Sequence, residues 1–359
     1  MNIVILGLSI TSSWGNGHAT TYRSLVKGLF NKGHHVLFLE RDVPWYSNQR
    51  DCIHFNYCKA SLYSSLSDLK LRFEQDVQKA DLVILGSYVP EGVEAGKWIL
   101  KTATGITAFY DIDTPVTLAK LESDDFEYIH PEIIPQFDFY FSFSGGPVLD
   151  VFMSKYGAQK SRPLYCSVDH DLYYPEETVQ KWDLGYLGTY STDRQPPLKK
   201  LLVDVAECWP EGSFAVAGPQ YPPSIAWPAN VERIEHLPPA EHRQFYNEQR
   251  FTLNITRKDM IRMGYSPSVR LFEAAACGTP VISDYWEGLD DYFRFGDEIL
   301  ISYSADDTLG YLINISEEER RRIGHHARMK VLASHTGIRR AEELEMYVRE
   351  LNPKGLVSG

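Results

Sequence analysis

The first forty residues decide the fold. Residues 2–8 (NIVILGL) are a short apolar run, residues 18–32 have a helical pattern, and residues 36–39 (VLFL) are a second apolar run. Gly33 follows the helical pattern, in the position where a glycine typically closes a helix. A strand, a helix and a second strand in this order form a βαβ unit, which predicts a parallel sheet.

The same alternation continues along the chain. Apolar runs predict further strands at residues 82–86, 106–110 and 137–143, and again from about residues 182, 213, 251, 280 and 298. These runs are nearly continuous in apolar residues, as strands buried on both faces are. Segments such as 91–102 are long enough for crossover helices, and 317–333 and 337–351 predict two final helices. We therefore expect an α/β protein built from two parallel-sheet halves.

The expected domain boundary lies in residues 163–175 (PLYCSVDHDLYYP). This stretch has a proline at each end and polar turn residues between the two α/β series. A chain of 359 residues also predicts two domains, at roughly 100 to 200 residues per domain. We predict an N-terminal domain over residues 1–165, a C-terminal domain over 176–335 and a final helical segment over 336–359.

Composition excludes several classes of function. The chain is 43% hydrophobic, as globular proteins are, and its net charge of −12 disfavours nucleic acid as a partner. Its five cysteines include no CxxC pair, which argues against a disulfide framework or a zinc site. The N-terminus lacks a basic leader, and no apolar stretch approaches the roughly 18 residues that a transmembrane segment needs. We expect a cytoplasmic protein without a transmembrane segment.

The most specific segment is residues 264–288 (GYSPSVRLFEAAACGTPVISDYWEG). Ser266 and Pro267 predict the start of a helix of three turns, Gly278 its end, and residues 280–285 a buried strand. The helix would present its N-terminal N–H groups to an anion.

Arg270 and Glu273 lie three residues apart on this helix and allow two interpretations. They could form an intrahelical salt bridge. Alternatively, a diphosphate could lie at the helix start, with the Glu273 carboxylate accepting hydrogen bonds from ribose hydroxyls.

Residues 266–284 (SPSVRLFEAAACGTPVISD) resemble the donor-nucleotide signature of GT-B glycosyltransferases of the group-one type, which include the spore-maturation CgeB-like proteins. Residues 166–175 (CSVDHDLYYP) resemble the segment that joins the two Rossmann-like domains of many GT-B enzymes. The resemblance covers nearly the whole chain. It implies an acceptor domain and a donor domain facing across a cleft, with the last helix crossing back to the first domain. Many retaining members carry a second glutamate eight residues before the ribose-binding one, where this chain has Tyr265.

Residues after the strands of the C-terminal half are expected to bind the donor, because loops at the carboxyl ends of parallel strands face the ligand crevice. The candidates are Gly188, Thr189, Arg194, Gly218, His236, Thr256, Arg257, Ser268, Arg270 and Glu273. The glycines would let a nucleotide approach the backbone, and the arginines would oppose the diphosphate. His236 lies in a stretch that resembles the base-binding loop of the family. The alternatives are ordinary turns for the glycines and a surface position for His236.

The loop at residues 15–18 (GNGH) of the N-terminal half matches neither GxGxxG nor a phosphate P-loop, which excludes dinucleotide and ATP motifs. It resembles the glycine loop by which GT-B enzymes approach the donor diphosphate and the acceptor, and this makes Gly17 a donor-binding candidate. His18 would be a catalytic base or only a helix cap.

Asp111 and Asp113 follow the run at 106–110, and either carboxylate could activate an acceptor hydroxyl. Asp-x-Asp also marks the metal site of GT-A enzymes, but its position in the first of two Rossmann-like halves leads us to expect no metal. Turn chemistry at Asp113 is the alternative.

The sequence thus predicts transfer of a sugar from a nucleoside diphosphate sugar, UDP- or GDP-linked, to a hydroxyl of a glycan, protein or small molecule. No metal or permanently bound cofactor is expected. A nucleotide-sugar epimerase of the same fold and a non-catalytic sugar-nucleotide-binding protein are the alternatives.

Overall fold

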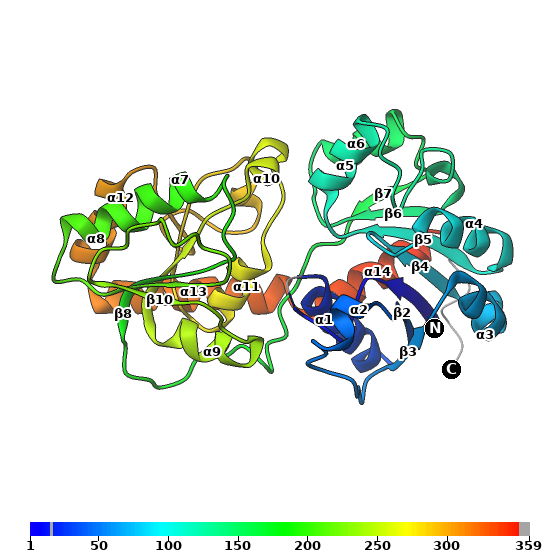
Figure 1. Cartoon of the computed structure of the whole chain (residues 1–359), viewed down its shortest axis with the longest axis horizontal. Helices are drawn as coiled ribbons and strands as arrows, with labels where there is room; N and C mark the ends of the chain where they lie inside the picture. Colours follow the sequence, from blue (N-terminus) through cyan, green and yellow to red (C-terminus); the bar gives the residue numbers. More distant parts are fainter. Residues whose placement is uncertain (15–16, 352–359) are drawn as a thin grey trace. The chain divides into compact units, whose positions relative to one another are not determined.

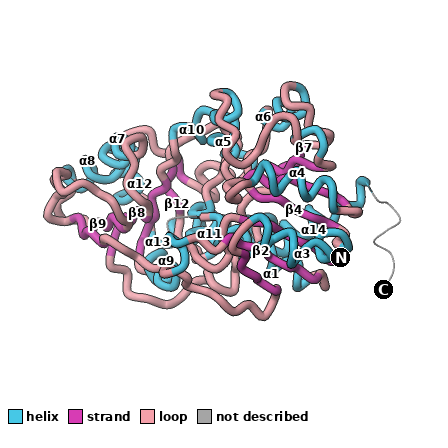
Figure 2. The backbone as a smooth tube through the Cα atoms, turned by 45° about the vertical axis from the view of Figure 1, so that its right-hand side comes forward, coloured by secondary structure: helices cyan, strands magenta, loops and turns pink. Residues whose placement is uncertain are grey.

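The computed structural model describes residues 1–14 and 17–351, and the chain divides into two compact units. Unit 1 comprises Met1–Ser167 together with the segment from Thr336 onward, and unit 2 comprises Val168–His335. Many of the helices and strands of both units are labelled in Figure 1. Each unit contains one parallel sheet, and Figure 2 shows the strands of each sheet flanked by helices.

Unit 1 contains a seven-stranded parallel sheet in the order β3-β2-β1-β4-β5-β6-β7. Its strands are β1 (Asn2–Gly7), β2 (His35–Arg41), β3 (Lys59–Tyr63), β4 (Leu82–Gly86), β5 (Ile106–Asp111), β6 (Phe139–Ser142) and β7 (Ser161–Pro163). Its helices are α1 (His18–Asn31), α2 (Pro44–Ser47), α3 (Leu66–Lys79), α4 (Gly92–Thr102), α5 (Thr114–Glu122), η1 (Ile134–Gln136), α6 (Val148–Ser154) and α14 (Gly337–Leu351).

Helix α14 completes the core of unit 1. Leu344, Tyr347 and Val348 pack into the same apolar cluster as the central strands. Close packing against α1 depends on glycine, because a Cβ on Gly28 would lie 2.0 Å from the backbone oxygen of Gly337. Helix α14 therefore belongs to unit 1, as the family resemblance implies for the last helix.

Unit 2 contains a six-stranded parallel sheet in the order β10-β9-β8-β11-β12-β13. Its strands are β8 (Trp182–Leu187), β9 (Phe214–Ala217), β10 (Val231–Ile234), β11 (Gln249–Asn254), β12 (Val281–Ser283) and β13 (Leu300–Ile301). Its helices are α7 (Gln195–Leu198), η2 (Lys199–Val203), α8 (Asp204–Cys208), α9 (Pro239–Asn247), α10 (Lys258–Met263), α11 (Val269–Ala276), η3 (Leu289–Asp291), α12 (Ala305–Asn314) and α13 (Glu317–Ser334).

Three strands have no counterpart in the sequence prediction: β3, β7 and β10. Each lies at the edge of its sheet, where one side has no neighbouring strand. Edge strands are short and carry polar residues, so the apolar run that identifies a central strand is missing. The parallel pairing of β1 with β2, which α1 connects, is the βαβ unit that the first forty residues predict.

The prediction that Ser266 caps the helix of the 264–288 segment is wrong. Helix α11 begins at Val269 with Ser268 in the N-cap position, so it is eight residues long and shorter than the three turns expected. The chain before it is held in a turn in which Gly264 and Tyr265 have φ values of +71° and +50°. The Ser266 hydroxyl donates to the Gly264 carbonyl within this turn (2.8 Å).

Candidate functional site

The buried side chain of Asn254 organises the carboxyl end of the unit 2 sheet. Its Oδ1 accepts hydrogen bonds from the Ser268 hydroxyl (3.1 Å) and from Arg270 Nη1 (3.0 Å). Its Nδ2 donates to Thr256 Oγ1 (3.1 Å) and to Ser283 Oγ (2.9 Å). Three predicted donor-binding residues thus converge on one amide, which sequence reasoning did not select as a site residue. The signal for Asn254 is its position as the last residue of a buried strand.

Glu273 is buried on the second turn of α11, where Oε2 accepts a hydrogen bond from the Tyr246 hydroxyl (3.3 Å). Burial and the neighbouring Glu273 carboxylate hold the pKa of Tyr246 and that of Tyr173 well above the usual range. Both phenols therefore remain protonated near neutral pH, and Tyr246 acts as a hydrogen-bond donor to the carboxylate.

Arg270 forms no ion pair with Glu273 in the described part of the chain. Its guanidinium instead reaches Asn254 and lies 5.2 Å from the centroid of the Tyr186 ring. The intrahelical salt bridge that the spacing allows is thus not formed. Arg270 and Glu273 are held apart by different partners, an arrangement that suits two separate contacts to a ligand.

Gly188 and Gly218 bring the loops after β8 and β9 into direct contact. A Cβ on Gly218, which has a φ of +137°, would lie 2.1 Å from the Gly188 carbonyl oxygen. A Cβ on Gly188 would lie 3.0 Å from Arg270 Nη2 and 2.5 Å from the Tyr186 hydroxyl. The Tyr221 hydroxyl donates to the Gly188 carbonyl (3.2 Å). The close approach of the Gly188 backbone accounts for Gly218, and the nearby Tyr186 and Arg270 side chains account for Gly188.

The remaining basic candidates lie on loops tied together near this point. Arg194 donates to the Thr189 carbonyl (2.7 Å) and to the Ser191 hydroxyl (2.8 Å), which braces its own loop. The Lys258 amide donates to Asp193 (2.9 Å) and joins that loop to the start of α10, where Arg257 is the N-cap residue.

Positive charge also gathers around Tyr221. Burial raises the pKa of Tyr221, whereas the guanidinium groups of Arg233, Arg194 and Arg270 act to lower it. These three arginines therefore surround the contact between the two glycine loops, where an anion would be stabilised.

Two other donor candidates differ from this group. Thr256 donates its amide (2.8 Å) and its hydroxyl (2.7 Å) to the Asp284 carboxylate, so its polar atoms bind protein groups. Burial raises the pKa of Asp284, and these two hydrogen bonds oppose the rise. His236 is exposed on the loop after β10. Of the two, Thr256 joins the Asn254 cluster, because it accepts a hydrogen bond from Asn254 Nδ2 (3.1 Å).

Asp111 is fully buried in unit 1, and this burial weighs against its predicted role as a base. Its Oδ1 accepts from the Thr117 hydroxyl (2.7 Å) and its Oδ2 from the Tyr140 hydroxyl (2.7 Å). Burial raises the pKa of Asp111 to about 6, against the lowering effect of these hydrogen bonds. A carboxylate with both oxygens bound inside the core has no path to an acceptor hydroxyl.

Asp113 and His18 remain as candidates in unit 1. Asp113 is half-buried at the N-cap of α5 and accepts a hydrogen bond from the Tyr88 hydroxyl (3.1 Å). His18 begins α1 and is buried, which lowers its pKa from 6.5 to about 4. The imidazole is therefore neutral at physiological pH, and the same burial disfavours its protonated form.

Of the glycine loop at residues 15–18, Gly15 and Asn16 lie outside the described residues. Gly17 is exposed, and a Cβ on it would meet nothing within 4 Å. Packing within the described residues therefore gives no reason for a glycine at position 17.

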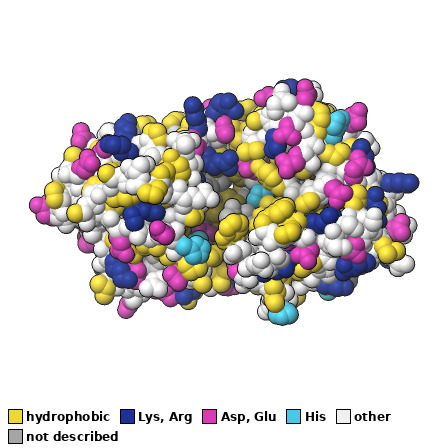
Figure 3. All heavy atoms as spheres, viewed as in Figure 1, with side chains coloured by type: hydrophobic (Ala, Val, Ile, Leu, Met, Phe, Trp, Pro, Cys, Tyr) yellow, Lys and Arg dark blue, Asp and Glu magenta, His cyan; other side chains and the backbone are white. Residues whose placement is uncertain are grey.

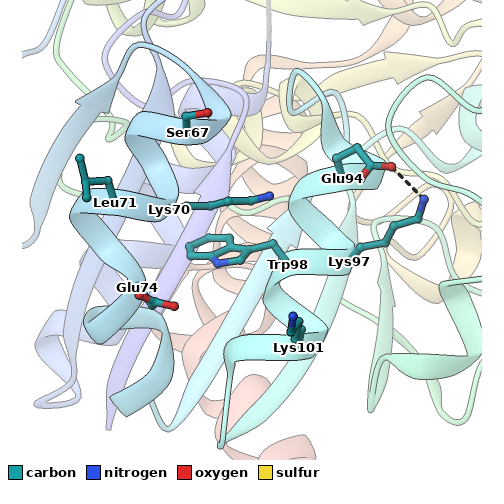
Figure 4. A pocket seen from close by; sticks show the side chains of 8 residues that line it. All are labelled: Ser67, Lys70, Leu71, Glu74, Glu94, Lys97, Trp98 and Lys101. Atoms are coloured by element: carbon teal, nitrogen blue, oxygen red, sulfur yellow. Dashed lines mark hydrogen bonds and ion pairs between the residues drawn. The ribbon is translucent and has the colours of Figure 1, made fainter.

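One surface groove, of about 650 Å³, lies between α3 and α4 and is drawn in Figure 4. Lys70, Lys97, Lys101 and the edge of Trp98 line it together with Glu74 and Glu94, and Lys97 is paired with Glu94 (2.8 Å). It contains none of the predicted site residues. Acidic and basic side chains are likewise interspersed on the face shown in Figure 3.

Residues 1–14 and 17–351 contain neither a metal-binding cluster nor a helix suited to a membrane. No group of three histidine, cysteine or carboxylate side chains there is arranged to hold a metal ion. In the same residues, no helix combines the length and the apolar character needed to span a membrane.

Comparison with known proteins identifies the class. Residues 194–346 match the family described as glycosyl transferase-like. A sucrose-phosphate synthase from Thermosynechococcus elongatus has a similar structure, with 15% identity and a TM-score of 0.68 over 98% of this chain and 99% of that chain. The Anabaena protein HepE in complex with UDP and glucose has 11% identity and a TM-score of 0.70, over 98% and 100%. An α-glucosyltransferase in complex with UDP has 13% identity and a TM-score of 0.72, over 97% and 99%. No curated protein matches the sequence.

The two parallel-sheet units and these similar structures define a GT-B fold. The matched family covers most of unit 2, where the Asn254 cluster and the two glycine loops lie. The protein thus has the GT-B fold, and its residues 194–346 are similar to glycosyl transferases. The predicted fold and the predicted reaction class are thereby confirmed.

Proposed function

We propose that the protein transfers a glycosyl group from a UDP-sugar to an acceptor hydroxyl, with unit 2 binding the donor. The cluster of Ser268 and Arg270 on Asn254, beside the buried Glu273, is the observation that carries this proposal. The solved structures of HepE and of the α-glucosyltransferase, both of which are complexes with UDP, support uracil as the base. The segment 266–284 supports membership of the CgeB-like group.

Each part of the donor would meet a different part of this site. The Glu273 carboxylate, which has only acceptor atoms when ionised, would bind the ribose hydroxyls. Arg270 and Arg257 would oppose the diphosphate, and the contact between Gly188 and Gly218 would let it approach the backbone. His236, on the loop after β10, would lie toward the base. Thr189, Arg194 and Thr256 would hold the loops that shape the site.

Catalysis would come from two sources. Positioned guanidinium groups stabilise the negative charge that develops on the departing UDP, and they need no reorganisation at the moment of reaction. His18 or Asp113 of unit 1 would accept the proton of the acceptor hydroxyl. Asp111 would support the adjacent chain rather than take part. In this proposal no residue is assigned to a metal ion.

Thermal unfolding in the presence of UDP, GDP and ADP tests the donor site, because a ligand that binds only the native state raises the melting temperature. We expect UDP to give the largest shift. The Glu273→Gln variant should lose about tenfold to 100-fold in UDP affinity, since a hydrogen bond to a charged group contributes about 1.5–3 kcal/mol.

Glu318→Gln is the matched control, because Glu318 is exposed on α13 of the same unit. Equal UDP affinities in the two variants would refute the ribose role. Incubation with UDP-glucose alone then separates the reaction types. Slow release of UDP is expected of a transferase that uses water as acceptor. A new UDP-sugar without UDP release would identify an epimerase, and binding without any turnover on a panel of acceptors would identify a binding protein.

A further inference from the structure

Tyr88 contacts both of the candidate acceptor-side residues of unit 1. Its hydroxyl donates to Asp113 Oδ2 (3.1 Å). Its ring packs edge-on against the His18 imidazole, with the ring centroids 5.4 Å apart and the planes at 77°. His18 begins α1, whereas Asp113 follows β5, so one side chain links two segments that are distant in the sequence.

The backbone at Tyr88 is strained. Its φ of +62° lies in the left-handed region, which is unfavourable for an L-residue with a bulky side chain. Glycine would adopt this conformation without that cost. The chain nevertheless places a tyrosine here, directly after the buried strand β4 and Ser87. Strain of this kind persists where the surrounding structure requires a particular side chain.

The surroundings of Tyr88 leave its ring little freedom. The ring packs 4.6 Å from that of the buried Tyr128, and the Tyr128 hydroxyl is hydrogen-bonded to Thr117 (2.8 Å). Thr117 in turn donates to the buried Asp111 (2.7 Å). Burial and the Asp113 carboxylate raise the pKa of Tyr88, so its phenol stays protonated and donates to Asp113.

His18 depends on packing for its orientation. The ring is buried, and its Nδ1 has no hydrogen-bond partner among the described residues. Because no hydrogen bond holds the imidazole at Nδ1, the side chains packed around it set its orientation. The Tyr88 ring is one of these side chains.

We propose that Tyr88 is a positioning residue of the acceptor half, whose hydroxyl orients the Asp113 carboxylate and whose ring orients the His18 imidazole. This inference rests on the proposed function, in which one of those two groups accepts the proton of the acceptor. It assigns to Tyr88 a role that neither the donor site nor the fold requires. It also explains why a strained position carries a large aromatic side chain.

A double-mutant cycle on UDP-glucose hydrolysis tests the hydroxyl. Tyr88→Phe should lower kcat about tenfold, because a hydrogen bond to a charged group is lost, and leave the KM for UDP-glucose unchanged. In the Asp113→Asn background the same change should cost nothing further, because Tyr88 acts through Asp113. If the two substitutions lowered kcat independently, so that their fold-losses multiplied in the double variant, the proposal would be overturned. Tyr22→Phe is the control, since it removes a buried phenol oxygen of unit 1 that lacks a hydrogen-bond partner among the described residues.

Nuclear magnetic resonance of the His18 imidazole tests the ring without any turnover, with His18→Gln used to assign its signals. Tyr88→Leu should shift the His18 signals, whereas Tyr88→Phe, which keeps the ring, should leave them in place. Unchanged His18 signals in Tyr88→Leu would overturn the positioning role. Absence of UDP release by the wild-type protein would count against the proposed function instead, and the resonance measurement would still decide the role of Tyr88.

Discussion

Replacing His18 by glutamine should remove a pH-dependent part of the stability of unit 1. Burial lowers the pKa of His18 from 6.5 to about 4, because a charged imidazole at the start of α1 would lose its hydration. A difference of about 2.5 pKa units corresponds to about 3 kcal/mol at 1.36 kcal/mol per unit. At low pH this energy lowers the free energy of unfolding of the wild type, whereas His18→Gln has no imidazole to titrate at this position.

The direction follows from proton uptake. As pH falls below 6.5, the unfolded chain binds a proton at His18, whereas the folded protein binds it only near pH 4. The free energy of unfolding therefore decreases as the pH falls from 6.5 to 4. The free energy of unfolding of wild type minus that of His18→Gln should decrease by about 3 kcal/mol between pH 7 and pH 4.

Urea denaturation across this pH range provides the measurement. Because the chain has two units, unfolding should be followed by hydrogen exchange in peptides of β1 and α1, which report on unit 1. The exposed His54, also in unit 1, supplies the control variant His54→Gln. A wild-type minus His18→Gln difference that does not vary with pH would refute the buried, neutral state of His18 from which the prediction is worked.

Three further outcomes are expected. Burial raises the pKa of Asp111 from 3.8 to about 6, so the free energy of unfolding should decrease by about 3 kcal/mol as the pH rises through this window. In Asp111→Asn this decrease should be absent from the same urea series. Gly28→Ala should destabilise unit 1 by about 3 kcal/mol or more in thermal unfolding, because its Cβ would meet Gly337, whereas Gly17→Ala should stay within about 0.5 kcal/mol. Asn254→Ala should reduce UDP affinity about tenfold by calorimetry with little change in circular dichroism, because Ser268 and Arg270 lose their common acceptor.

The positions of the central strands of each sheet could be predicted from the sequence, because buried parallel strands need continuous apolar runs. The edge strand β10 (VERI) could not, since half of its residues are charged and only Val231 is fully buried. The start of α11 was misplaced for a different reason. Ser266 and Pro267 have the composition of a helix start, but the left-handed backbone at Tyr265 delays the helix to Val269.

The candidate site, like the fold, could be predicted from the sequence only in part. Loops at the carboxyl ends of parallel strands could be identified from the strand pattern, and this selected Gly188, Gly218 and Arg257. The environment of a single side chain could not. Asp111 and Asp113 look alike in the sequence, but β5 ends at Asp111, whose side chain enters the core. Asp113 precedes the next helix, and its half-buried carboxylate accepts from Tyr88 instead. Tertiary contacts alone distinguish the two carboxylates.

The hydrogen bond from the Val168 amide to the His335 carbonyl (3.0 Å) joins the first and last residues of unit 2. Unit 2 is therefore an insertion into unit 1, and its two ends are neighbours. On the ribosome, unit 2 is complete once residue 335 has emerged, although its synthesis starts later. Unit 1 must wait for Leu344, Tyr347 and Val348 before its core can close. The half of the protein that is made first is thus the last to finish folding.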